Sequence, residues 1–263
     1  VKTQRCLFMI QKLIINNISD LYYQLSKASL VPYPSSTDTS DASWYGTPSY
    51  DTSVELLKKG DQGSFDQIKE AQGRYQVATN FDTKNSTLRD VVGSNPCVPA
   101  YVLGIPKNMY RHVPISNPTP SVTLVYDRGM ACGYNSSVLA EDGVFIAEYI
   151  KQLELHNVAT RLYIGVSCYN SGNYYVTMTR FKNYNERMLL YPLAYPLVNP
   201  SFLRRTTFRL YESVPEFTVL THNGYGKDTR QKERIASIKQ VITDSKVLVL
   251  NHEEISKMKN KVH

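Results

Sequence analysis

Oxygen-bearing side chains follow the first clear strand pattern of this chain. Asp127 comes directly after the apolar residues 121–126, and an amide and two hydroxyls follow shortly afterwards in Asn135, Ser136 and Ser137. The carboxyl end of a strand is where open α/β sheets build their sites, and oxygen ligands suit Mg²⁺. Asp127, Ser136 and Ser137 are therefore candidate ligands of a divalent cation such as Mg²⁺, the one cofactor that the sequence suggests.

A structural role for the same residues is the favoured alternative. Asp127 can cap the turn that follows it, with Arg128 neutralising its charge, and one carboxylate is usually too few for a cation site. Asp142 is a second carboxylate, but its place before Gly143 predicts that it caps a helix.

Three arginines, Arg204, Arg205 and Arg209, lie beside two phenylalanines. Guanidinium groups recognise phosphate and carboxylate, so this cluster is a candidate surface for a polyanion or a protein partner. On a helix Arg205 and Arg209 share a face. An internal ion pair with Glu212 or Glu186 explains the cluster equally well, and both interpretations stay open.

Catalytic motifs are not recognisable in the sequence. The five histidines show no HxxxH or HxH spacing and the four cysteines no CxxC spacing, which disfavours zinc and nucleophile chemistry. Residues 222–227 hold two glycines but lack the spacing of a phosphate loop. A non-enzymatic function is favoured, although the question of an enzyme stays undecided.

Composition indicates a soluble, intracellular globular protein. The 263 residues are 42% hydrophobic and 20% charged, and the net charge of +7 admits a nucleic-acid partner. No run approaches the roughly 18 apolar residues of a membrane span. Twenty tyrosines favour protein interfaces, where this side chain is enriched.

The elements that must position these residues form an α/β pattern. Strands are predicted at residues 121–126 and 161–166 with a helix at 142–155 between them, which is the unit of a parallel sheet. Further strands are predicted at 174–182 and 246–250, and a helix at 230–243. We expect a three-layer, mostly parallel, doubly wound sheet with flanking helices, in which residues 90–109 form a long irregular connection with a short helix at 99–103.

The N-terminal residues are predicted to form a separate extension. Apolar residues recur at helical spacing over residues 6–25, and residues 31–43 are rich in Pro, Ser, Thr and Asp, as in a linker. We therefore expect an extension at 1–43 and an α/β domain at 44–263. The helix would dock on a partner chain through Leu13, Ile14 and Leu21.

Several motifs carry a resemblance to a known family: residues 89–93 (RDVVG), residues 121–137 (SVTLVYDRGMACGYNSS) and residues 199–205 (NPSFLRR). Over residues 44–226 the chain resembles a domain family of unknown function found mainly in tailed bacteriophages. The core also looks like a degenerate von Willebrand factor A-like, Rossmann-type sheet. Such modules place Asp-x-Ser-x-Ser after the first strand to hold a cation, whereas Arg128 and Gly129 follow Asp127 here.

The resemblance and the residues together predict a non-enzymatic phage protein that acts as a protein-binding and assembly module. Its partners would be other phage proteins in a multi-chain assembly, and its location the virion or the host cytoplasm. Two alternatives remain, a metal-dependent enzyme that processes nucleic acid and a DNA-binding accessory protein.

Overall fold

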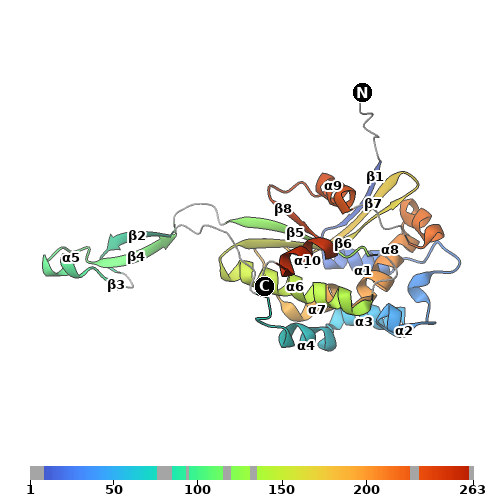
Figure 1. The fold of residues 1–263 in the computed structure, drawn as a ribbon, viewed down its shortest axis with the longest axis horizontal. Helices are drawn as coiled ribbons and strands as arrows, with labels where there is room; N and C mark the ends of the chain where they lie inside the picture. Colours follow the sequence, from blue (N-terminus) through green and yellow to red (C-terminus); the bar gives the residue numbers. More distant parts are fainter. Residues whose placement is uncertain are drawn as a thin grey trace, which may run out of the picture.

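The computed structural model describes residues 9–75, 85–92, 95–114, 120–130, 135–225 and 231–260. Its centre is a five-stranded sheet in the order β1-β7-β6-β5-β8 (Figure 1). The strands are β1 (Ile10–Ile15), β5 (Ser121–Asp127), β6 (Ala159–Asn170), β7 (Asn173–Lys182) and β8 (Val247–Leu250). Strand β5 pairs in parallel with both β6 and β8, and β1 pairs in parallel with β7, while β7 runs antiparallel to β6. The expected mostly parallel α/β sheet is confirmed.

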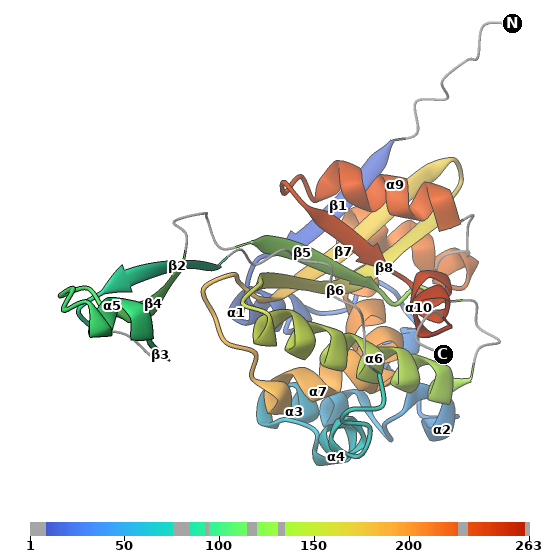
Figure 2. The same cartoon turned by 60° about the vertical axis from the view of Figure 1, so that its left-hand side comes forward.

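Helices cover both faces of the sheet, which gives three layers. The helices are α1 (Ile18–Leu25), α2 (Ala42–Tyr45), α3 (Tyr50–Lys59), α4 (Gln62–Glu70), α5 (Val98–Val102), α6 (Ser136–Leu155), α7 (Leu190–Val198), α8 (Phe208–Ser213), α9 (Gln231–Val241) and α10 (His252–Lys259). Shorter helical turns are η1 (Ser35–Thr37), the π-helical η2 (Phe202–Thr207) and η3 (Pro215–Asn223). Figure 2 shows α9 on one face and α6, α7, α3 and α4 on the other. None of the helices in the described part of the chain has the length and apolarity of a membrane span.

Side chains that point alternately to the two faces of the sheet form a hydrophobic core on each face. In β5, Leu124 and Tyr126 pack toward α6 and α7, whereas Val125 packs with Ile238 of α9 on the opposite face. Successive side chains of a strand point to opposite faces. Strand β5 is therefore buried on both sides, as its mostly apolar run, interrupted by Thr123, predicts.

The close contact between α6 and α7 depends on a glycine. A Cβ atom at Gly143 would collide with the carbonyl group of Leu197. Only glycine lets the two backbones approach so closely. Helix α6 is thereby seated on α7 and can serve as the crossover between the parallel strands β5 and β6.

A second, smaller sheet forms an arm that projects from the rest of the molecule (Figure 1). Its strands β2 (Asn85–Asp90), β4 (Met109–Pro114) and β3 (Asn95–Pro96) pair antiparallel in the order β2-β4-β3, and α5 lies between β3 and β4 in the chain. The short helix expected at residues 99–103 is present as α5. The sequence does not signal these strands, because β2 is mostly polar, β3 is two residues long, and both β3 and β4 end in a proline.

The expectation of one helix over residues 6–25 is wrong for the part of it that forms β1. Residues 10–15 pair with β7, and the helix begins only at Ile18, with Asn17 as its N-cap. Isoleucine-rich residues favour a strand, and a six-residue strand also fits a helical spacing by chance. Residues 6–8 lie outside the described residues.

Leu13, Ile14 and Leu21 all pack within their own chain. Leu13 and Ile14, adjacent in β1, contact the cores on opposite faces of the sheet. Leu21 is completely buried in the core, where its helix α1 contacts β1, β7 and α8. The full burial of Leu21 argues against its docking on a partner chain, whereas Leu13 and Ile14 are only partly buried and their docking stays a prediction.

Replacement of Leu21 by alanine should lower the free energy of unfolding by about 2–5 kcal/mol, because a fully buried leucine would leave a cavity. Tyr23→Ala on the same helix is the control: its side chain is 64% exposed and should cost less than about 1 kcal/mol. Urea titration of both variants measures the difference. A neutral Leu21→Ala would contradict the packing of α1 on this core.

Candidate functional site

Asp127, the first candidate ligand, is fully engaged by protein groups. One carboxylate oxygen lies 2.6 Å from Nη2 of Arg234 on α9, and the other accepts the backbone N–H groups of Gly129 at 3.1 Å and Ser167 at 3.2 Å. A guanidinium group thus occupies the cationic position at this carboxylate. The turn-capping role is present, but Arg234 supplies the neutralising charge that was expected of Arg128.

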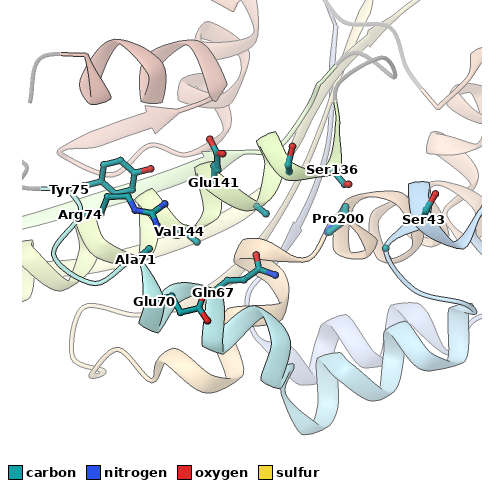
Figure 3. A pocket seen from close by; sticks show the side chains of 13 residues that line it. Ser43, Gln67, Glu70, Ala71, Arg74, Tyr75, Ser136, Glu141, Val144 and Pro200 are labelled. Carbon is teal, nitrogen blue, oxygen red and sulfur yellow. The ribbon is translucent and has the colours of Figure 1, made fainter. Parts of the chain in front are cut away.

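Ser136 and Ser137 lie elsewhere, at the first turn of α6. Asn135 caps that helix, so Asp142 is not its N-cap. The two serines line a pocket of about 450 Å³ between α4 and α6, together with Gln67, Glu70, Ala71, Arg74, Tyr75, Glu141 and others, but Asp127 does not line it (Figure 3). In the part of the chain that the structure describes, no three His, Cys, Asp or Glu side chains gather as metal ligands would.

The arginine cluster binds the chain's own N-terminal segment. Arg205 is completely buried, donates to the carbonyl oxygens of Ser36 at 2.8 Å, Asp38 at 2.9 Å and Thr47 at 2.8 Å, and stacks over Tyr45. Such a side chain presents no surface to a polyanion. Its partners are backbone carbonyls, a possibility that the spacing of charged residues does not reveal.

The two neighbouring arginines also bind backbone carbonyls of the N-terminal segment. Arg204 donates to the carbonyl of Trp44 and lies over its ring. Arg209 donates to the carbonyl of Lys27 at 2.8 Å, and its guanidinium lies 3.9 Å from the carboxylate of Glu212. The predicted pairing with Glu212 is present at this longer distance, and the carbonyls are the closer partners.

Glu212 completes this attachment from the same helical region. Its carboxylate accepts the backbone N–H of Ser36 at 2.9 Å, the Ser36 hydroxyl and the Tyr225 hydroxyl at 2.7 Å. Its backbone carbonyl accepts the N–H of Leu30 at 2.7 Å. Residues 30–38 are therefore fixed to the domain, because their polar groups satisfy a buried carboxylate.

Two other side chains that could take part in chemistry, Cys168 and Asp142, are also buried in structural roles. Burial raises the pKa of Cys168 to about 12, so its thiol stays protonated and is a poor nucleophile near neutral pH. Asp142 is buried and contacts His252 Nδ1 at 2.7 Å and Lys259 Nζ at 3.0 Å. These contacts attach the C-terminal helix α10 to α6, and the sequence offers no sign of them because the partners are more than a hundred residues apart.

The arm is the candidate interaction surface. Six of its apolar side chains are at least 59% exposed, and they are Val91, Val92, Val98, Tyr101, Val102 and Leu103. Scattered single apolar residues are ordinary on a protein surface, but a concentration of them marks a binding site. No chemical motif signals this surface in the sequence, because α5 is short and the apolar residues follow no helical or strand period.

The role of Arg205 predicts a loss of stability on substitution. Arg205→Met would leave three carbonyls without their donor and should lower the free energy of unfolding by at least about 3 kcal/mol. Arg187→Met, which removes the same charge from an exposed position, should change it by less than about 0.5 kcal/mol. Equal unfolding midpoints in urea for the two variants would contradict the assigned role.

Comparison with known proteins places the chain in a family. The family model of a domain of unknown function, DUF7192, matches residues 8–261. Neither the curated proteins nor the solved structures gave a match. The match begins before β1, so the N-terminal residues that we expected to lie outside the family domain are part of it. This chain belongs to the family of the domain of unknown function DUF7192.

Proposed function

We propose that this protein is a non-enzymatic protein-binding and assembly module, a component of a bacteriophage virion or of its assembly pathway. The observation that carries the proposal is the projecting arm (Figure 1), which has a concentration of exposed apolar side chains. The phage origin rests on the resemblance of the sequence motifs. The abundance of tyrosine supports a role in protein interfaces, where this residue is enriched.

The arm buries little of its own apolar surface. Among the arm side chains that the structure describes, Cys97 and Ala100 are buried, whereas Tyr101, Val102 and Leu103 are 70%, 76% and 75% exposed. A three-stranded sheet needs a covered apolar face for stability. Covering apolar surface contributes about 25 cal/mol per Å², so a partner on this face would stabilise both the arm and the complex.

The charge of the arm indicates the chemistry of that partner. Residues 97–106, which include α5, contain no Asp, Glu, Lys or Arg, although the whole chain carries a net charge of +7. A nucleic-acid backbone would require cationic side chains here. An uncharged apolar face instead fits an apolar surface on another protein of the same assembly, and we take such a protein to be the occupant.

The buried groups support a binding role over a catalytic one. Asp127 is paired with Arg234, and the arginines expected to clamp a phosphate hold backbone carbonyls of their own chain. Among the described residues, the groups expected to serve a metal-dependent enzyme therefore have structural partners instead. The DNA-binding alternative rests on net charge alone.

A charged substitution on the arm tests the proposal. Val102→Asp combined with Leu103→Asp should reduce the amount of this chain in purified phage particles at least tenfold, because two carboxylates would be desolvated at an apolar interface. Quantitative mass spectrometry of the particles measures the incorporation. Circular dichroism and the urea midpoint establish that the variant is folded.

Leu155→Asp is the matched control, since Leu155 is 72% exposed but lies at the end of α6, outside the arm. It should be incorporated like the wild type. Absence of the wild-type chain from particles would overturn the virion version of the proposal, and normal incorporation of the arm variant would overturn the role of the arm. Absence combined with DNA binding that weakens steeply between about 50 and 200 mM salt would favour the DNA-binding function.

A further inference from the structure

The pocket between α4 and α6 is a second surface feature, which the proposed function does not use (Figure 3). Helix α4 lines it with Gln67 and Ala71, and α6 lines it with Ala140 and Val144. Residues four positions apart share one face of a helix. The two facing rows form a groove of about 450 Å³, which lies within the roughly 300–1,000 Å³ of typical binding pockets.

The groove has an apolar floor and a charged rim. Ala71 and Val144 are 3% and 6% exposed, and both belong to the hydrophobic core beneath the groove. Glu70, Arg74 and Glu141 line it from exposed positions. Two carboxylates against one guanidinium leave the rim with a net charge of −1, so its occupant should be apolar and carry a cation at its edge.

The end of the arm has this complementary character. Helix α5 lies at the far end of the arm (Figure 1), and residues 97–106 contain no charged side chain. Tyr101 and Val102 on this helix are 70% and 76% exposed. Lys107 comes immediately after the uncharged run and is also exposed. Docking of α5 in such a groove would cover apolar surface on both partners and bring opposite charges together at the rim.

The arm and the groove are two different surfaces of one chain. In both views the arm extends away from α4 and α6 (Figures 1 and 2), so an arm in this orientation meets the groove of another molecule. A contact between two different surfaces is heterologous. Each copy that joins keeps a free arm or a free groove, and further copies add to a ring or a filament.

We propose that the arm of one copy docks in the groove between α4 and α6 of a second copy of this chain. Helix α5 covers the apolar floor, and Lys107 lies beside the carboxylates of Glu70 and Glu141. This inference rests on the proposed function and identifies the other protein of the assembly as a further copy of the same chain.

Sedimentation of the purified full chain over a range of concentrations tests the proposal. The wild type should associate reversibly beyond a dimer, and Gln67→Trp, which fills the groove, should associate at least tenfold more weakly. Gln240→Trp is the matched control, because Gln240 is exposed on α9, on the opposite face of the sheet (Figure 2). A wild type that stays monomeric up to about 1 mM, or equal association of the two tryptophan variants, would overturn the proposal.

Mixing two variants tests whether the contact joins an arm to a groove. The arm variant, Val102→Asp with Leu103→Asp, keeps its groove, and Gln67→Trp keeps its arm. Each should be monomeric alone, and the mixture should form a 1:1 complex that grows no further, since one compatible contact remains. A mixture that stays monomeric at concentrations where the wild type associates would contradict the contact.

Circular dichroism establishes that the variants are folded, and Glu141→Lys, which reverses an exposed charge of the rim, replaces Gln67→Trp if that variant does not fold. Incorporation into particles separates this inference from the proposed function. Loss of the arm variant from particles together with normal incorporation of the groove variant would make a different protein the partner and overturn this inference alone. Normal incorporation of both would overturn the role of the arm as well.

Discussion

The enclosure of Arg205 by backbone carbonyls is the interaction on which the N-terminal part of the structure depends. Three carbonyl oxygens between residues 36 and 47 converge on one buried guanidinium, and Glu212, two helical turns later, receives the N–H and the hydroxyl of Ser36. A buried charge must be matched by hydrogen bonds. The polar segment after α1 therefore supplies the hydrogen bonds that these two buried charges need in place of water.

This attachment explains why β1 and α1 belong to the same body as the central strands. Strand β1 extends the sheet beyond β7, α1 buries Leu21 and Leu25 beneath it, and the segment that follows returns to the arginines of η2 and α8. The family match over residues 8–261 likewise includes β1 and α1. The arm is the contrasting case, because it exposes apolar side chains where the N-terminal elements bury theirs.

Local patterns were sufficient for the central elements and insufficient for pairings between distant residues. The apolar, β-branched runs of β5 and β6 can be recognised from a few residues each, because burial on one or two faces dictates their composition. For β1, four apolar residues in a run of six fit a helix as well as a strand, and the deciding partner, β7, is about 160 residues away. The strands of the arm are likewise defined by their pairing and not by their composition.

In the candidate site, too, local sequence predicts the place of a residue but not its distant partner. Asp127 was correctly placed at the end of its strand, but its neighbour Arg128 could not be its partner, because adjacent residues of an extended chain point to opposite sides. Arg234, 107 residues further on, takes that place. Which arginine pairs with Asp127 is a property of the folded sheet.

Hydrogen–deuterium exchange of the free chain and of the chain incorporated in particles tests the central claim most directly, since it reports on both segments at once. The amides of β1 and α1 should be protected equally in both states, and those of β3, α5 and β4 should gain protection only on assembly. Arm amides that exchange alike in both states, or N-terminal amides that gain protection on assembly, would contradict the account.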